Sequence, residues 1–388
     1  MKKSIKRGLM YGITANVILL SLTSLLADIS SEMIQPILPL FITALGAGGL
    51  IVGILGGLSD SFASIFHMIS GHLSDKTGKR KSFIIGGYSI SAVAKLFMAA
   101  AKSWIAILIL RPIERIGKGI REPPRDAILA ETTPKSVHGK VFGFNKAFDR
   151  TGAIFGSILA IIFMTLGFVY NKIFLIAAII SFASVIPLIF VKEKKLKPKK
   201  IKLQLGMKNF PRDLKIFIWI TTLFSLANFS YMFFILRANA ASSAIAAVAL
   251  YLISNIIFEL LATPSGIIAD RIGKKKVIIA GYLLLLLTNI LFIFYNSFTA
   301  LIIGFIIYGL SQALTSGNER ALTADLAKRK NLGTAIGTSY MYVSIAALPA
   351  SIIAGTLWQY VSPQSAFIYG AAVSFLALLA MLLIRIKE

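Results

Sequence analysis

The sequence predicts an all-α membrane protein with twelve transmembrane helices, arranged as two similar six-helix halves, and with both termini in the cytoplasm. Three observations support this prediction: the composition, the number of long apolar stretches, and the distribution of Lys and Arg. Of the 388 residues, 56% are hydrophobic and only 15% are charged, whereas soluble proteins average roughly 25% charged residues. So few charges exclude a soluble enzyme, a disordered protein and a coiled coil.

Each transmembrane helix needs about 20 mostly apolar residues, and twelve such stretches follow one another along the chain. They span residues 13–42, 49–72, 82–101, 103–121, 138–166, 171–191, 214–237, 242–269, 277–296, 298–318, 332–358 and 363–385.

The basic residues predict the topology. With these spans, 32 of the 41 Lys and Arg lie on the side of the termini and 3 lie on the other side. The positive-inside rule therefore predicts that both termini lie in the cytoplasm. We expect the protein to reside in the cytoplasmic (inner) membrane. The net charge of +25 then reflects loops at lipid headgroups, and we expect no nucleic-acid partner.

A lysine-dense segment divides the chain. We expect an N-terminal bundle of residues 1–191, a basic cytoplasmic linker of residues 192–213 that rests on anionic lipid, and a C-terminal bundle of residues 214–388. The two bundles repeat each other, because the loop after span 2 recurs after span 8 at an offset of 195 residues. Asp28 and Asp60 of the first half are matched by Asn228 and Asn255 of the second.

The repeated loop carries the sequence pattern G-x-x-x-D-[RK]-x-G-[RK]-[RK]. The pattern begins at Gly71 in the first half and at Gly266 in the second, where Ile272 occupies the variable position before the second glycine. In this pattern the chain resembles the major facilitator superfamily. A second signature of that family, R-x-x-x-G, fits Arg115 to Gly119. A third, the antiporter motif G-x-x-x-G-P, is only partial, since Gly152 and Gly156 are followed by Ser157.

The residues around Asp28 and Arg111 resemble a prokaryotic branch of the superfamily with mostly unassigned substrates. The resemblance implies transport by alternating access and leaves the solute open. It also implies that the repeated loops form a latch between the halves, in which Arg121 or Arg125 would pair with Asp75; the alternative is a topology anchor without a gating role. The expected latch residues are Gly71, Asp75, Gly78, Arg80, Arg115, Asp270, Arg271 and Gly273.

Charges inside the spans indicate a functional site, because each costs about 2.5–3.5 kcal/mol on insertion scales. Asp28, Asp60 and Arg111 fall near the middle of their spans, where transporter sites lie. Asp28 and Glu32 share one helix face, and two carboxylates so close favour one that carries a proton. Alternatively, Asp28 pairs permanently with Arg111 or Lys95 and only fixes helix packing. The candidate substrate or proton-coupling residues are Asp28, Glu32, Asp60, Arg111, Asn228, Asn255 and Glu259.

Spans 4 and 5 carry further charges nearer their cytoplasmic ends, among them Lys118, Lys146, Asp149 and Arg150. Their helical spacing predicts an ion network between the two helices, with Glu114 and Asp149 as internal counter-ions.

The sequence shows no nucleophile–base pair, nucleotide-binding loop or metal-ligand cluster. We therefore expect no enzymatic activity, no cofactor and no metal. The expected function is secondary active transport of a small molecule by a monomer in the bilayer. The carboxylates inside the spans favour the proton as the driving ion, with sodium as the alternative. The partial antiporter motif slightly favours export. An importer of a small organic anion would explain Arg111 better, and a transporter fold used for sensing or lipid handling is a further alternative.

Overall fold

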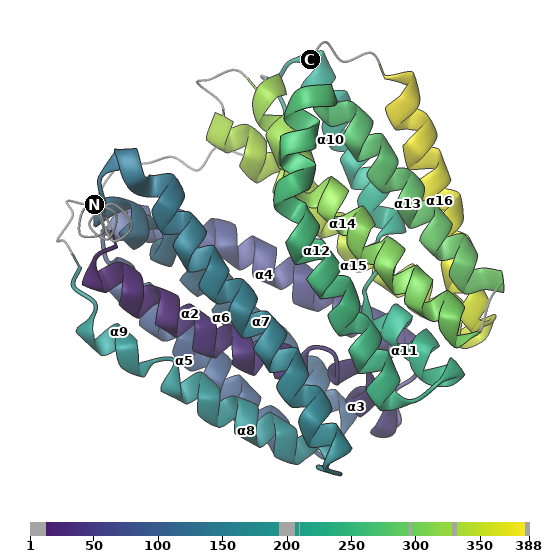
Figure 1. Ribbon diagram of the computed structural model, residues 1–388, viewed down its shortest axis with the longest axis horizontal. Helices are drawn as coiled ribbons and strands as arrows, with labels where there is room; N and C mark the ends of the chain where they lie inside the picture. Colours follow the sequence, from purple (N-terminus) through teal and green to yellow (C-terminus); the bar gives the residue numbers. More distant parts are fainter. Residues whose placement is uncertain (1–12, 194–205, 209, 295–296, 328–331, 385–388) are drawn as a thin grey trace, which may run out of the picture. The chain divides into compact units, whose positions relative to one another are not determined.

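The computed structural model describes residues 13–193, 206–208, 210–294, 297–327 and 332–384, and these form helices joined by short connections (Figure 1). Most of the predicted linker and the basic N-terminal residues lie outside the described residues. The N-terminal helices are α2 (Ala15–Ile34), α3 (Leu38–Ala44), α4 (Gly49–Thr77), α5 (Arg80–Ala99), α6 (Trp104–Glu131), η1 (Lys135–Val137), α7 (His138–Thr165), α8 (Tyr170–Ala183) and α9 (Ile186–Phe190). The C-terminal helices are α10 (Arg212–Ala227), α11 (Met232–Ala241), α12 (Ala244–Ile272), α13 (Lys274–Phe294), α14 (Phe298–Leu326), α15 (Leu332–Tyr360) and α16 (Pro363–Leu383).

In the part of the chain that the structure describes, every predicted span is helical, which confirms the predicted all-α membrane fold. Eleven helical segments of the described chain are long and apolar enough to cross a membrane. The one predicted span missing from these eleven is the fourth, which forms α6. This helix is as long as the others but carries five charged residues between 104 and 121. It continues to Glu131, and α14 continues to Leu326, both beyond the predicted ends, because hydropathy detects only the apolar part of a helix.

Three spans are interrupted. Span 1 breaks between α2 and α3, where Pro36 removes a backbone donor, and span 6 breaks before Pro187. Span 7 breaks between α10 and α11 without a proline. Asn228 ends α10 with φ −93° and ψ 62°, and its backbone N–H donates to the carbonyls of Phe224 and Ser225. Such breaks expose polar backbone and side-chain groups at membrane depth, which transporters use to bind solutes.

The helices pack into two compact units. Unit 1 comprises residues 1–35 and 65–203, and unit 2 comprises residues 36–64 and 204–388. The break at Pro36 thus separates α2 from α3, and α4 contributes its first half to unit 2 and its second half to unit 1. The predicted division into bundles at residues 191 and 214 stays a prediction.

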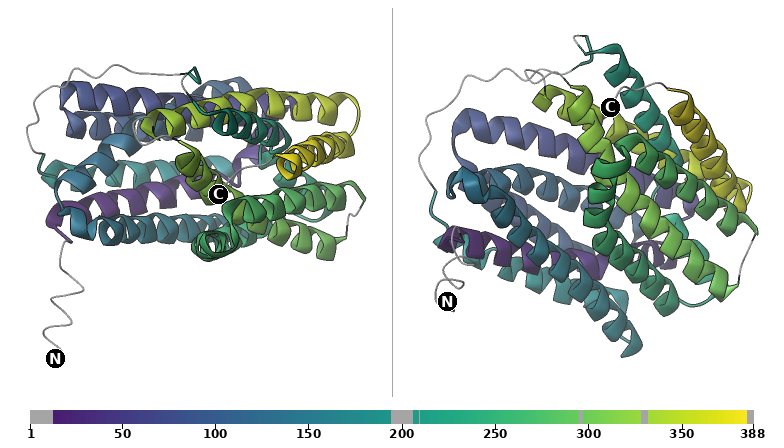
Figure 2. Two further views of the ribbon diagram at one scale, coloured as in Figure 1. Left: turned by 90° about the horizontal axis from the view of Figure 1, so that it is seen from above. Right: turned by 45° about the horizontal axis from the view of Figure 1, so that its top comes forward.

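In unit 1, α2 runs alongside α7, and α5 alongside α6 (Figures 1 and 2). Glycines allow both approaches: a Cβ atom at Gly87 of α5 would lie 2.6 Å from the carbonyl oxygen of Gly117 on α6. The apolar core under these helices contains Val17, Ile84 and Leu129, each fully buried.

In unit 2, α14 packs against α12 and α13, and α13 against α16. The aromatic rings of Phe234, Phe292 and Phe367 lie 5.2–5.4 Å apart, centroid to centroid, and fill the space between α11, α13 and α16. The first half of α4 packs on α15, where the Ser61 hydroxyl donates to the Ser344 carbonyl oxygen at 2.8 Å.

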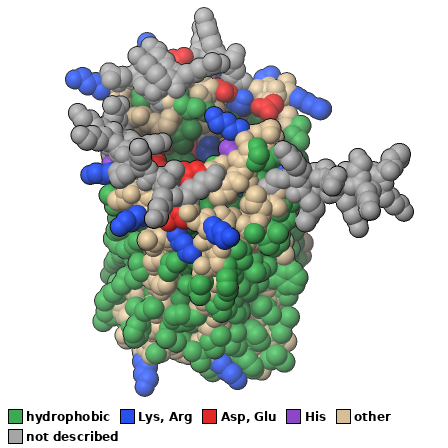
Figure 3. Space-filling view, turned by 90° about the vertical axis from the view of Figure 1, so that its left-hand side faces the viewer, with side chains coloured by type: hydrophobic (Ala, Val, Ile, Leu, Met, Phe, Trp, Pro, Cys, Tyr) green, Lys and Arg blue, Asp and Glu red, His purple; other side chains and the backbone are tan. Residues whose placement is uncertain are grey.

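The surface has the pattern of a membrane protein. On the face shown in Figure 3, hydrophobic side chains cover the lower part, and Lys, Arg, Asp and Glu gather toward one end. Charges at one end of the helices agree with the loop charges in the sequence. The placement of that end in the cytoplasm stays a prediction.

Candidate functional site

The two acids of α2 lie where α7 approaches most closely. A Cβ atom at Gly152 would lie 3.1 Å from the Asp28 Cβ, and one at Gly156 would lie 3.0 Å from the Glu32 Cβ. The two glycines of the partial G-x-x-x-G motif therefore allow α7 to pack against the Cβ atoms of both acids. Glu32 is half-buried, and its Oε2 is buried with no hydrogen-bond partner among the described residues.

The buried cations next to these acids are paired with a third acid, Glu114. Arg111 Nη1 lies 2.8 Å from Glu114 Oε2, and Lys95 Nζ lies 3.9 Å from Glu114 Oε1. All three side chains are at most 2% exposed. Both cations also bind α2: Lys95 donates to the Ser30 and Ser31 hydroxyls at 2.9 Å each, and Arg111 donates to Gln35 Oε1 at 3.4 Å.

A permanent pair of Asp28 with Arg111 or Lys95 was the packing alternative suggested by the sequence. The structure assigns both cations to Glu114 instead, because Glu114 lies on α6 one turn from Arg111 and faces α5. Glu114 is therefore the acid that lies within 4 Å of both cations. Glu114 is confirmed as an internal counter-ion.

Replacing Glu114 by glutamine is expected to destabilise the protein by about 3–5 kcal/mol, since Lys95 and Arg111 would stay buried without a compensating charge. Thermal unfolding of the purified protein in detergent would measure this. The matched control on α6 is Glu122→Gln. Its ion pair with Lys118 is 3.7 Å long and about 30% exposed, so a loss below about 1 kcal/mol is expected. Equal losses in both variants would contradict a structural role for the buried triad.

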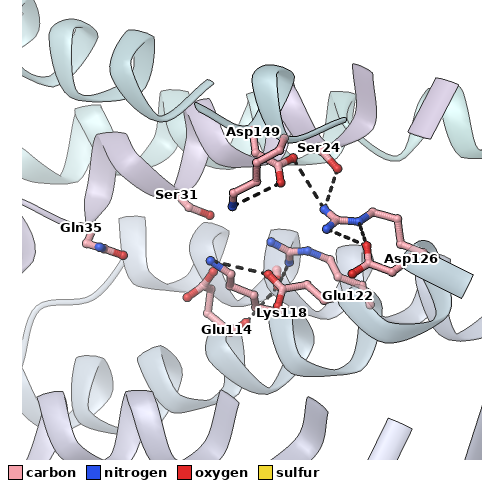
Figure 4. A network of polar contacts seen from close by, with 12 residues as sticks. Ser24, Ser31, Gln35, Glu114, Lys118, Glu122, Asp126 and Asp149 are labelled. Atoms are coloured by element: carbon pink, nitrogen blue, oxygen red, sulfur yellow. Dashed lines mark hydrogen bonds and ion pairs between the residues drawn. The ribbon is translucent and has the colours of Figure 1, made fainter. Parts of the chain in front are cut away.

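A second network joins α2, α6 and α7 (Figure 4). Arg125 lies 3.0 Å from Asp126 and 3.7 Å from Asp149, and it donates to the Ser24 hydroxyl at 2.8 Å. Lys146 lies 3.9 Å from Asp149. An ion network between spans 4 and 5 is present as predicted, with Asp149 at its centre, but its cation on α6 is Arg125, while Lys118 pairs with Glu122 of the same helix.

The loop after α4 is fastened within unit 1. Arg80, the first residue of α5, lies 3.0 Å from Asp75 and 2.7 Å from Glu131 at the end of α6. Gly78 has φ +70°, which few other residues adopt. The expected partners of Asp75 were wrong: Arg121 instead donates to Ser91, and Arg125 joins the second network.

The repeated loop in unit 2 is fastened in the same way. Lys274, the first residue of α13, lies 3.3 Å from Asp270 and 2.8 Å from Asp325 at the end of α14. Gly273 has φ +100°. Lys274 is thus the structural equivalent of Arg80. The two differ by 194 positions, whereas Asp75 and Asp270 differ by 195, so the repeat offset changes by one residue within this loop.

Three other expected latch residues are not in these triads. A Cβ atom at Gly71 would contact Pro123 of α6 at 3.4 Å, so α4 and α6 lie close there. Arg271 is exposed, and Arg115 is half-buried on α6.

Unit 2 contains a polar pocket of about 190 Å³ between α10, α14 and α15. Asn228, at the break of span 7, accepts a hydrogen bond from Gln312 Nε2 at 3.1 Å. Tyr282 of α13, fully buried, donates to Glu319 Oε1 at 2.9 Å. The pocket is lined by Thr221, Phe224, Ser225, Asn228, Gln312, Thr315, Ser316, Glu319, Arg320, Thr323, Ile336, Ser339, Tyr340 and Val343.

Of the expected second-half residues, only Asn228 lines this pocket. Asn255 and Glu259 are half-buried on α12. Asp60, on the part of α4 that belongs to unit 2, acts electrostatically on Tyr308 of α14. Sequence reasoning did not select Gln312 or Tyr282, although polar residues in an apolar span are a signal for them.

Comparison with known proteins decides the family. The family model of the Major Facilitator Superfamily matches residues 20–258 and again residues 218–388. The chain belongs to the Major Facilitator Superfamily. The resemblance seen in the sequence is thereby confirmed, and the protein is a multi-pass membrane transporter rather than an enzyme.

Individual members of the superfamily resemble the chain to different degrees. An uncharacterized MFS-type transporter of Methanocaldococcus jannaschii is 43% identical over 96% of this chain and 95% of its own length. The multi-drug resistance efflux pump PmrA of Streptococcus pneumoniae is 31% identical over 144 residues, 35% of each chain. The crystal structure of the nucleoside transporter NupG has a TM-score of 0.80 at 16% identity, covering 96% of this chain and all of NupG, which shows a shared fold.

Proposed function

We propose that the protein is a proton-coupled secondary transporter that exports a small solute across the cytoplasmic membrane by alternating access. The observation that carries this proposal is the state of Glu32. Its Oε2 is buried with no hydrogen-bond partner in the part of the chain that the structure describes, while the nearby cations Lys95 and Arg111 are paired with Glu114. A buried carboxyl oxygen that accepts no hydrogen bond is poorly stabilised as a carboxylate, which favours uptake of a proton.

Two observations support export over import. Gly152 and Gly156, the two glycines of the partial antiporter motif, pack against the turn of α2 that carries Asp28 and Glu32. The partly matching PmrA is an efflux pump. An importer of organic anions has less support, because the charge of Arg111 already faces Glu114 at 2.8 Å.

Proteoliposomes that hold a pH-sensitive dye would test the proposal. Compounds from a library of amines, alcohols and carboxylates are added outside, and internal pH is recorded. A saturable, compound-dependent proton flux that is lost in Glu32→Gln supports proton-coupled transport. Flux that depends on sodium instead would overturn the proton as coupling ion. Saturable binding without any flux would favour a sensing role.

We further propose that the triads around Arg80 and Lys274, each within its own unit, hold the helix ends in the arrangement that the expected latch requires. Asp75→Asn is expected to change stability by less than about 1 kcal/mol, because Asp75 is 45% exposed, yet to increase the open population at that end of the helices. The chain has no cysteine, so a Ser339→Cys variant offers a single thiol in the pocket. Its labelling rate should rise in Asp75→Asn and stay constant in the exposed control Lys76→Gln. An unchanged rate would leave Asp75 as a topology anchor.

A further inference from the structure

The polar pocket of unit 2 contains several hydroxyl groups that can only accept hydrogen bonds from a bound molecule. Four of its lining hydroxyl groups already donate to backbone carbonyls of their own or a neighbouring helix. A hydroxyl group has one hydrogen, so each of these oxygens can only accept a further bond. The four donations are Thr221 to Ile218 at 3.0 Å, Ser225 to Val343 at 2.8 Å, Thr315 to Ser311 at 2.9 Å, and Thr323 to Glu319 at 2.8 Å.

The acid of the pocket is held in a fixed position. Glu319 is half-buried, and one of its oxygens accepts the Tyr282 hydroxyl at 2.9 Å. Tyr282 itself stacks on Phe224, with 3.7 Å between ring centroids. A carboxylate has about four lone-pair sites on its two oxygens, so Glu319 can accept further bonds from a molecule in the pocket.

The cation of the pocket faces a ring. The Arg320 guanidinium lies 4.7 Å from the centroid of Tyr340, an arrangement in which the ring's negative face attracts the charge. Arg320 is exposed, whereas Glu319 is half-buried. The more deeply placed charge of the pocket is therefore negative, and the lining around it includes acceptor hydroxyls and the aromatic ring of Phe224.

We infer that this pocket binds its solute through a primary or secondary ammonium group. The ammonium hydrogens would bond to Glu319 and to the acceptor hydroxyls of Thr221, Ser225 and Thr315, and an apolar part of the solute would lie against Phe224. As the substrate site of a transporter, this inference rests on the function proposed above.

Binding of three matched probes to the purified full-length protein tests the inference. The probes are 2-phenylethylammonium, the neutral 2-phenylethanol and the anionic 3-phenylpropanoate, and binding is measured by calorimetry. The ammonium is expected to bind most tightly. Glu319→Gln should weaken its binding about tenfold or more, since a hydrogen bond to a charged group is lost. The control Asp213→Asn removes an acid of α10 outside the pocket and should leave binding unchanged.

Two results would overturn the inference: equal or tighter binding of the propanoate, or ammonium binding that Glu319→Gln does not change. If Glu319→Gln does not fold, Thr221→Val removes one acceptor while keeping the shape, and it should weaken the ammonium more than the alcohol. Calorimetry needs no proton gradient. If the ammonium binds but no flux is seen, proton-coupled transport is rejected and this inference stands. If flux is seen but the ammonium is not preferred, this inference is rejected and proton-coupled transport stands.

Discussion

Replacing Gly53 by alanine is expected to reduce transport about tenfold or more by opening the contact between α4 and α15. A Cβ atom at Gly53 would overlap the carbonyl oxygen of Ser351, and one at Gly57 would lie 2.7 Å from the Leu348 Cα. Both contacts lie within unit 2. We propose that they form a gate, because small residues allow helix backbones to meet and to separate again.

Helix propensity alone predicts that Gly53→Ala stabilises α4, so a loss of transport would point to the contact with α15. Alanine stabilises a helix by about 1 kcal/mol relative to glycine, so Gly53→Ala would be neutral or stabilising if the contact did not matter. The control is Gly86→Ala on α5, where a Cβ atom would meet nothing within 4 Å. Flux into proteoliposomes and labelling of a single cysteine at Ser351 measure both effects. Normal flux and unchanged labelling in Gly53→Ala would show that the contact is not a gate.

Much of the fold was predictable because one physical rule governs it. A span of about 20 apolar residues is required to cross the hydrocarbon core, and short basic loops choose its direction. The break at Pro36 follows from the missing backbone donor. The break at Asn228 contains no proline, and nothing in its local sequence distinguishes it from an ordinary polar residue in a helix.

The site was predictable only where one helix decides it. Asp28 and Glu32 share a face through their spacing, and both indeed lie beside α7. Which cation meets which acid depends on how helices far apart in sequence pack, so Asp75 was assigned to Arg121 or Arg125 when it pairs with Arg80. The hydrogen bond from Gln312 to Asn228 could not be predicted for the same reason, because it joins helices that are far apart in the sequence. The spacing of Gly49, Gly53 and Gly57 did not enter the prediction, although small residues four apart are a known signal of a close helix contact.

Replacing Glu32 by glutamine, or Asp28 by asparagine, is expected to abolish accumulation driven by a pH gradient while exchange of solute across the membrane continues. The acid within 4 Å of both Lys95 and Arg111 is Glu114, and we propose that Asp28 and Glu32 are left to handle the proton. An amide keeps the size and the hydrogen-bonding atoms of the side chain but cannot release a proton. Loss of proton coupling with retained exchange is therefore the specific signature, and loss of both activities would indicate a packing or binding role instead.

The repeat supplies an internal argument for this outcome. Position 228, the equivalent of Asp28, is already an amide, and it accepts a bond from Gln312 in the polar pocket of unit 2. If unit 1 handles the proton and unit 2 the solute, Asn228→Asp should change solute affinity and leave the coupling to Glu32 intact. Gradient-driven accumulation and exchange, measured in the same proteoliposomes for Glu32→Gln, Asp28→Asn and Asn228→Asp, separate the two roles. Exchange lost in Asp28→Asn but kept in Glu32→Gln would assign the proton to Glu32 alone and make Asp28 a solute-binding residue.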